Sequence, residues 1–144
     1  MDLTILDAGV LIAILNSADV HHEHARVAIS AARGRGDRLV LPASAYAEIL
    51  VAPFKQGAAS GDAVDAFLEA LPASVEPATR DIARRAAELR ARHGTRLRLP
   101  DALVVATAIV LQARRVVTTD ARWPDLGMHV EVVGQAAISA PFKY

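Results

Sequence analysis

Short apolar runs alternate with amphipathic stretches along this chain, and the change of period predicts alternating strands and helices. The first run, Leu3–Leu6, leads directly into Ala8–Leu15, a stretch rich in Ala, Leu and Ile. This pattern predicts a buried strand of the parallel type that runs straight into a helix. Further short strands are predicted at residues 39–41, 74–76, 114–119 and 130–133.

Between these runs, small apolar residues recur every three or four positions, which is typical of helices packed on one face. Helices are predicted over residues 21–33, 79–93 and 102–113, and a further helical face comes from Val64, Phe67, Leu68 and Leu71. Another helix is predicted over residues 46–51, capped by Ser44 and ended by Pro53. The glycine-containing segments 34–37 and 57–61 are predicted to be loops.

Strands that alternate with helices indicate an α/β fold, an α/β/α sandwich around a mostly parallel sheet. The length of 144 residues is that of one typical domain, so residues 1–144 are predicted to form a single domain. With 53% hydrophobic residues, the chain can build a core and differs from disordered sequences.

Composition removes several kinds of chemistry. The chain has no cysteine, which excludes a disulfide scaffold, a thiolate zinc site and a cysteine nucleophile. Its 16 basic and 16 acidic residues cancel, so nucleic-acid binding would depend on local patches. The apolar stretch 102–113 is shorter than the roughly 18 residues of a membrane span, and Asp2 stands where a signal peptide carries Lys or Arg. We therefore expect a cytoplasmic protein with no membrane partner.

Four carboxylates interrupt core-like sequence: Asp7, Glu48, Asp101 and Asp120. In a parallel α/β sheet, the carboxyl ends of the strands and the starts of the following helices share one edge, so these acids are expected to converge there. Each acid alone also has an ordinary interpretation. Asp7 and Asp101 are equally well placed as helix caps, Glu48 fits a salt bridge at the surface, and Asp120 fits a turn.

Together the four acids point to a metal site. Two carboxylates about 4 Å apart repel by about 4 kcal/mol at an effective dielectric constant of about 20, so a cluster needs compensation. A divalent cation supplies it, and oxygen ligands favour Mg²⁺ or Mn²⁺ over zinc. The pattern therefore predicts a metal-assisted phosphodiesterase.

The segments around these acids resemble the PIN-domain ribonucleases, and most closely the VapC toxins of VapBC toxin-antitoxin pairs. The resemblance covers nearly the whole chain. It is carried by segments 6–12 (LDAGVLI), 22–25 (HEHA), 47–49 (AEI), 99–106 (LPDALVVA) and 117–120 (VTTD), the last followed by Trp123.

The resemblance implies a PIN-like α/β/α sandwich and a Mg²⁺-dependent endoribonuclease, with Mn²⁺ able to substitute, that acts as the toxin of a toxin-antitoxin pair. It implies that Asp7, Glu48, Asp101 and Asp120 are the catalytic and metal-binding acids, with Asp7 and Asp101 the most direct ligands, and that Thr118 supplies a supporting hydroxyl. The implied substrate is transfer or ribosomal RNA. The implied partner is a cognate VapB-type antitoxin that wraps the toxin and inserts a basic side chain into the acidic site.

The chain departs from the family pattern in two places. Gly9 stands where many relatives carry a Ser or Thr whose hydroxyl helps to order the site. After Asp120, where some relatives have a further Asp or Asn, this chain has Trp123 and Asp125, and Asp125 is not assigned to the site.

Arginine supplies 14 of the 16 basic residues. Arg96 and Arg98 are the candidates for RNA contact because they lead into Asp101, whereas Arg84 and Arg92 fit a solvated helix face. Aromatic residues make up only 4% of the chain, which favours recognition of RNA shape and backbone over base stacking. A lone tryptophan, Trp123, is more typical of a core than of a stacking platform.

The histidines His21, His22 and His24 lack a paired carboxylate motif and are interpreted as surface and packing residues. The aromatic residues Tyr46, Phe54 and Phe67, with the aliphatic faces of the early helices, predict a groove for a homodimer or for the antitoxin.

Two alternatives stay open. One is a catalytically silent PIN-like protein-binding domain in which the acids are caps and salt bridges. The other is a phosphoacceptor or phosphatase domain, which also places Asp at strand ends. Against the second, Asp7 is followed by Ala8 and Gly9 rather than by another Asp, and the only lysines are Lys55 and Lys143.

Overall fold

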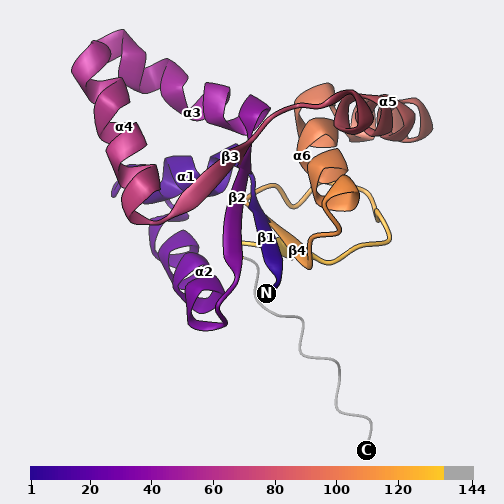
Figure 1. Ribbon diagram of the computed structural model, residues 1–144, viewed down its shortest axis with the longest axis horizontal. Helices are drawn as coiled ribbons and strands as arrows, with labels where there is room; N and C mark the ends of the chain where they lie inside the picture. The colour runs from indigo at the N-terminus through magenta and orange to yellow at the C-terminus, as the bar shows by residue number, and fades with distance from the viewer. Residues whose placement is uncertain (135–144) are drawn as a thin grey trace, which may run out of the picture.

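A parallel five-stranded sheet runs through the molecule in the computed structural model, which describes residues 1–134 (Figure 1). The strands are β1 (Leu3–Leu6), β2 (Arg38–Pro42), β3 (Ala73–Glu76), β4 (Arg115–Thr118) and β5 (Val130–Val132). Their order across the sheet is β3-β2-β1-β4-β5, and every neighbouring pair is parallel. The α/β/α sandwich expected from the sequence is therefore confirmed. Lys143, one of the two lysines, lies outside the described residues.

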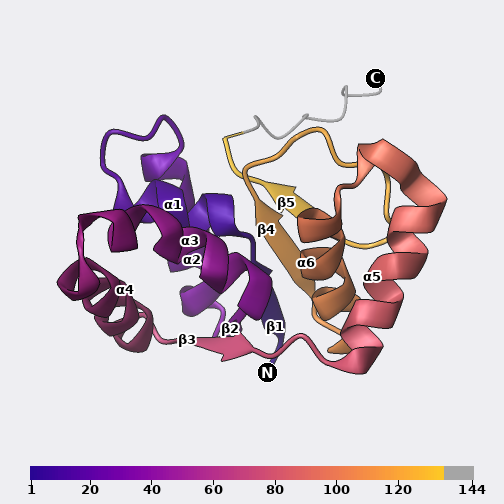
Figure 2. The same cartoon turned by 90° about the horizontal axis from the view of Figure 1, so that it is seen from above.

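Helices cover both faces of the sheet, as Figure 2 shows. On one side lie α1 (Ala8–Leu15), α2 (His22–Gly34), α3 (Ala43–Gln56) and α4 (Ala58–Ala70). On the other lie α5 (Arg80–His93) and α6 (Leu99–Val110), joined by a short 3₁₀ turn at Gly94–Arg96. The chain thus builds outward from β1 to β3, returns through α5 and α6, and resumes at β4.

This return makes the boundary between β1 and β4 the point where the strand order reverses. Thr4 of β1 lies opposite Arg115 of β4, and Leu6 lies opposite Val117, so the two strands end side by side. In open α/β sheets, ligands bind in the crevice outside the carboxyl ends of the strands at such a reversal. The fold therefore opens its crevice where Asp7 follows β1 and Asp120 follows β4.

The core explains why α6 is apolar almost all round. Its residues Val104 and Ala108 belong to the apolar cluster built on the sheet, whereas Ala102, Val105 and Ala106 cluster with residues of α5. A helix covered on two sides needs apolar residues on both faces. Burial of α6 in turn fixes its first turn, where Asp101 lies.

Helix bounds differ from the prediction most in α3 and α4. Ser44 does not cap α3, which begins at Ala43 directly after β2, and Pro53 lies inside the helix rather than ending it. The predicted loop 57–61 is also wrong, because α4 begins at Ala58 after the single residue Gly57, whose φ is 124°. Gly61 is there for close packing, because a Cβ on it would lie 2.1 Å from a ring carbon of Phe54.

The remaining strands and helices agree with the prediction to within a few residues. Helix α6 begins at Leu99 with Pro100 in its first turn and ends at Val110, earlier than residue 113. Thr79 caps α5 by accepting a hydrogen bond from the Ile82 N–H. Within residues 1–134, no helix is long and apolar enough to cross a bilayer.

Candidate active site at the carboxyl edge of the sheet

Asp7 is the innermost of the predicted acids. It follows β1 and caps α1, where one carboxylate oxygen accepts the Ala8 backbone N–H at 2.9 Å. The other oxygen accepts the Thr118 hydroxyl at 2.6 Å, and the residue is only 8% exposed. Burial raises the pKa of Asp7 above its ordinary value; the hydrogen bonds from Thr118 and Ala8 oppose this, and the charges of Glu48 and Asp120 add to it. Asp7 is thus both a cap and a carboxylate that its surroundings leave poorly neutralised.

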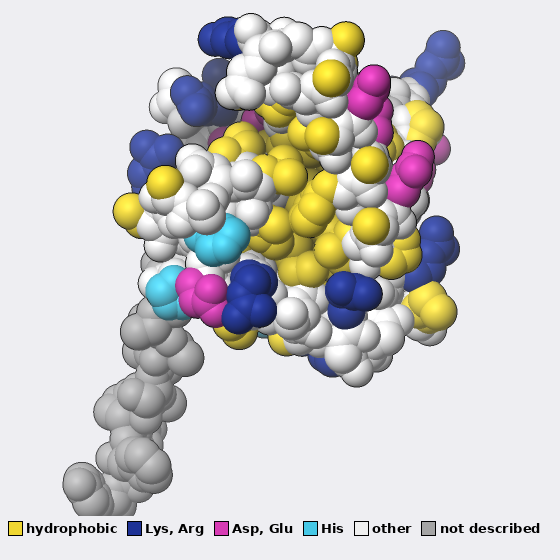
Figure 3. All heavy atoms as spheres, turned by 90° about the vertical axis from the view of Figure 1, so that its left-hand side faces the viewer, with side chains coloured by type: hydrophobic (Ala, Val, Ile, Leu, Met, Phe, Trp, Pro, Cys, Tyr) yellow, Lys and Arg dark blue, Asp and Glu magenta, His cyan; other side chains and the backbone are white. Residues whose placement is uncertain are grey.

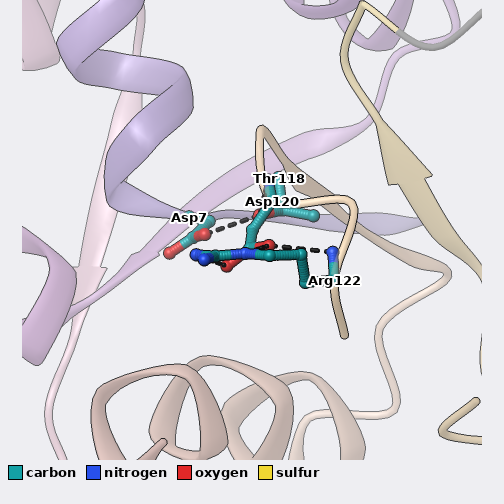
Figure 4. A network of polar contacts seen from close by, with 4 residues as sticks. All are labelled: Asp7, Thr118, Asp120 and Arg122. Atoms are coloured by element: carbon teal, nitrogen blue, oxygen red, sulfur yellow. Dashed lines mark hydrogen bonds and ion pairs between the residues drawn. The ribbon is translucent and has the colours of Figure 1, made fainter. Parts of the chain in front are cut away.

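Thr118 links two of the acids through one hydroxyl. It is the last residue of β4 and fully buried, and its hydroxyl donates to Asp7 while accepting the Asp120 backbone N–H at 3.1 Å. Figure 4 shows this connection between the ends of the two neighbouring strands. The structure therefore brings Thr118 to the position that the sequence predicts for a supporting hydroxyl.

Asp120 differs from Asp7 because a cation of the chain covers it. One carboxylate oxygen accepts the Arg122 backbone N–H at 2.9 Å and its Nε–H at 3.1 Å, and the other accepts Nη2–H at 3.2 Å (Figure 4). The hydrogen bond from the Arg122 side chain holds the pKa of Asp120 below its ordinary value, against the opposing effect of burial. Arg122 is the residue at this site that the sequence analysis missed. The one signal for it was the two-residue spacing from Asp120 within a predicted turn.

Asp101 and Glu48 approach from helices on opposite faces of the sheet. Asp101 lies in the first turn of α6, where burial and the charges of Asp7 and Asp120 raise its pKa. Glu48 lies in α3 and is exposed overall, but partial burial of its carboxylate and the charge of Asp101 raise its pKa as well. Each of the four predicted acids thus lies close enough to at least one other for their charges to interact.

A cavity of about 250 Å³ adjoins two of these acids. It is lined by Thr95, Arg96, Arg98, Asp101, Asp120, Arg122 and Trp123. Both arginines predicted for RNA contact therefore reach the site, and Arg98 lowers the pKa of Glu48, Asp101 and Asp120. The cavity is polar and combines carboxylates with guanidinium groups.

Trp123 belongs to the core and to the site. Its ring packs against both apolar clusters of the molecule, as expected for a lone tryptophan. Its indole nitrogen is buried and forms no hydrogen bond that meets the usual geometric limits within residues 1–134. This N–H lies close enough to Asp101 to lower the pKa of its carboxyl group. The ring therefore positions a polar hydrogen beside Asp101.

The side chain of Thr119 explains why position 9 carries Gly instead of the Ser or Thr that many relatives have. A Cβ on Gly9 would lie 2.3 Å from the Thr119 Oγ1, so the Thr119 side chain occupies the space that a larger residue at position 9 would need.

Asp125 and His22 make local contacts. The Asp125 carboxylate accepts a hydrogen bond from the Gly127 backbone N–H at 3.0 Å, which closes a turn. The His22 ring nitrogen Nδ1 lies 2.8 Å from the Ala13 carbonyl oxygen and so connects α2 to α1, in keeping with a packing role.

The four acids do not form a tight cage. Within the described residues 1–134, no three His, Asp or Glu side chains surround a single point closely enough to hold a metal ion by themselves. The donor set still fits a hard cation, because it consists only of carboxylate oxygens, and burial together with the charges of neighbouring acids raises three of the four pKa values. Mg²⁺ commonly binds one or two protein carboxylates and keeps several water ligands.

A family model of the PIN domain matches residues 4–127. The chain belongs to the PIN domain family. The parallel sheet with helices on both faces is thus the fold of a PIN domain. No curated protein sequence matches the chain.

Solved structures share this fold. A chain of VapBC2 from Rickettsia felis, bound to a DNA fragment from the promoter, superposes with a TM-score of 0.72 at 15% identity, covering 91% of this PIN domain chain and 98% of that chain. A toxin-antitoxin complex from Klebsiella pneumoniae gives 0.66 at 23% identity, with 81% and 86% covered. VapC20 from Mycobacterium tuberculosis, a toxin that cleaves the sarcin-ricin loop, gives 0.61 at 19% identity, with 78% and 86% covered. At these identities the likeness is one of fold.

Proposed function

We propose that this PIN domain is a metal-dependent endoribonuclease and the toxin of a toxin-antitoxin pair. The observation that carries the proposal is the group of four acids at the reversal between β1 and β4, three of which have raised pKa values. A cluster of acids without enough positive charge nearby lowers the stability of the fold. Proteins tolerate such destabilising groups mainly at functional sites. A divalent cation would remove the repulsion.

The acids have separate roles in this proposal. Asp7, Asp101 and Asp120 hold Mg²⁺, or Mn²⁺ in its place, and Thr118 keeps Asp7 and Asp120 in a fixed relation. A bound metal ion would supply positive charge that stabilises the negative charge building on the phosphate oxygens during in-line attack. Glu48, with Asp120, orients the attacking water and accepts its proton, and the raised pKa of Glu48 suits a proton acceptor.

RNA is the proposed substrate. One structural neighbour is a toxin that cleaves the sarcin-ricin loop, which supports RNA as the substrate, and transfer or ribosomal RNA stays the predicted target. Arg96 and Arg98 line the cavity beside Asp101 and are placed to pair with the phosphates of a bound strand. The low aromatic content favours contacts to the backbone over base stacking.

The proposed partner is a VapB-type antitoxin, since neighbours of this fold occur in toxin-antitoxin complexes. An apolar hollow for it runs along the face formed by α1, α3 and α4, where Figure 3 shows hydrophobic side chains gathered in a depression. The hollow is lined by Ile12, Leu15, Asn16, Ile49, Ala52, Pro53, Gln56, Ser60, Ala63 and Val64. The aromatic residues predicted for the groove, Tyr46, Phe54 and Phe67, are not among these lining residues, and the Tyr46 hydroxyl donates to Asp65 at 2.6 Å. A homodimer stays a prediction, which light scattering of the purified protein checks.

Cleavage of total cellular RNA by the purified protein tests the proposal. We expect discrete products with Mg²⁺ or Mn²⁺ and none with EDTA. Asp101→Asn should lower cleavage by about a hundredfold or more, because it removes a ligand charge from the site. Asp62→Asn is the matched control, since Asp62 is exposed on α4. Equal cleavage by both variants would contradict the proposal, and no cleavage at all would favour the silent binding domain.

A further inference from the structure

Arg122 occupies the oxygens that a cation would need. Both carboxylate oxygens of Asp120 accept an N–H from the Arg122 side chain, at 3.1 and 3.2 Å. Of the arginines that line the cavity, Arg122 is the one that forms an ion pair with an acid of the site among the described residues. Two cations cannot use the same lone pairs fully, so Arg122 and a metal ion compete for Asp120.

The Arg122 side chain is free to leave. It is 84% exposed and contributes nothing to either apolar cluster of residues 1–134, so its departure uncovers no core. Its backbone is fixed instead, by the hydrogen bond from its own N–H to Asp120 and by the packed ring of the next residue, Trp123. A guanidinium on a fixed backbone can swing between nearby anions without moving the site.

A second anion would lie within its range. Arg122 lines the same cavity as Arg96 and Arg98, so a phosphodiester group that entered would meet three guanidinium groups. Guanidinium pairs with phosphate through two parallel N–H···O bonds, the same geometry that Arg122 now uses on Asp120. The exchange keeps its charge paired in both states.

We propose that Arg122 is a transferable counter-ion, which neutralises Asp120 in the metal-free protein and pairs with an RNA phosphate once a divalent cation has taken Asp120. This rests on the proposed nuclease function and adds a residue to it. Arg122 is then a substrate-binding residue whose availability depends on the metal. RNA binding and metal binding become coupled without any movement of the backbone.

Metal affinity is the first test. In calorimetric titration with Mn²⁺ and no RNA, Arg122→Ala should bind the ion about two- to fivefold more tightly than the wild type at low salt, a gain that high salt reduces. Arg26→Ala is the matched control, because Arg26 forms an exposed two-point pair with Glu23 on α2, away from the cavity. Equal affinity in the two variants overturns the proposal. No Mn²⁺ binding by the wild type overturns the proposed function itself, which is a different result.

RNA affinity is the second test. Fluorescein-labelled total transfer RNA is titrated by anisotropy in Ca²⁺ and in EDTA, with its integrity checked on a gel. In Ca²⁺, Arg122→Ala should bind about tenfold more weakly than Arg26→Ala, because it lacks one phosphate contact. In EDTA the two should be alike, since Arg122 is then held by Asp120. Arg122→Lys, which keeps the charge but cannot donate two parallel hydrogen bonds from a planar guanidinium, should restore only part of the RNA affinity. A loss of the same size in both conditions overturns the transfer, because Arg122 would then bind RNA independently of the metal.

Discussion

Two aspartates at opposite ends of the strands each accept a hydrogen bond from a buried threonine hydroxyl, yet their pKa values shift in opposite directions. Asp7, at the carboxyl edge, accepts the hydroxyl of Thr118, and Asp37, at the amino edge, accepts the hydroxyl of Thr4 at 2.9 Å. Both threonines are fully buried strand residues. The pKa of Asp7 is raised and that of Asp37 is lowered.

Cations of the chain make the difference. The Asp37 side chain is 3% exposed, and although burial raises its pKa, hydrogen bonds from Thr4 and Arg35 and the charges of Arg35 and Arg115 outweigh that effect. Arg35 donates to it twice, at 3.2 and 3.1 Å, and Arg115 Nε lies 3.9 Å away. Asp7 has no cation in contact within residues 1–134, so its charge is left for a partner from outside. Asp37 is thus neutralised by arginines of its own chain, whereas Asp7, among the described residues, is buried without one and marks the functional edge.

Among substitutions of residues other than the acids, the largest difference in RNA cleavage is expected between Thr118→Val and Thr4→Val. Thr118→Val should lower RNA cleavage and Mn²⁺ affinity by about tenfold or more, because Asp7 and Asp120 lose the group that holds them in relation. Thr4→Val should leave both unchanged and lower the free energy of unfolding by about 1 kcal/mol. Cleavage assays, calorimetry and urea unfolding of the two variants measure this. A similar loss of cleavage in both would mean that the edges are not distinct.

Neutralising each aspartate should change stability in opposite directions. Asp37→Asn should lower the free energy of unfolding by about 1 to 3 kcal/mol, since Arg35 and Arg115 lose their buried partner. Asp7→Asn should raise it by about 1 kcal/mol, because an unpaired buried charge is removed and Asn is still a good cap. Urea unfolding without metal at pH 7 compares them. A loss of stability in Asp7→Asn would contradict the interpretation of Asp7.

The smallest predicted effect is in the pH dependence of stability. The lowered pKa of Asp37 stabilises the fold above about pH 4, and this contribution is lost as the pH falls below that value and Asp37 becomes protonated. The raised pKa of Asp7 acts the other way, because its charge lowers stability as the pH rises above about 4. Asp37→Asn should therefore reduce acid destabilisation, and Asp7→Asn should reduce the decline toward neutral pH. Each slope is at most about 1.4 kcal/mol per pH unit, and unfolding series from acid to neutral pH check both.

The sequence predicted the strands and the four acids because both depend on local pattern. A buried strand followed by an acid and a helix is visible in residues 3–15. Because all strands of a parallel sheet end on the same side, acids that follow different strands come together there. The helix over α3 was mispredicted at both ends, because it begins directly after β2 without a side-chain cap and continues through Pro53 to Gln56. The predicted loop after it is part of α4, where Phe54 packs over Gly61.

The cations of the site were beyond local pattern. Fourteen arginines are much alike in sequence, and which of them pairs with an acid depends on where the side chains end in space. Arg122 was overlooked for this reason, although Arg96 and Arg98 were found from their nearness to Asp101. The contrast between Asp7 and Asp37 was equally hidden, since it depends on Arg115 of β4 approaching the loop that carries Arg35 and Asp37.

Mn²⁺ binding by the wild type, Asp7→Asn and Asp37→Asn tests the central claim most directly. All three proteins are titrated by calorimetry at neutral pH, after circular dichroism has shown that each is folded. The account predicts that the wild type and Asp37→Asn bind Mn²⁺ alike and that Asp7→Asn binds it at least about tenfold more weakly. Equal binding by Asp7→Asn, or a loss confined to Asp37→Asn, would contradict the assignment of the carboxyl edge as the metal site.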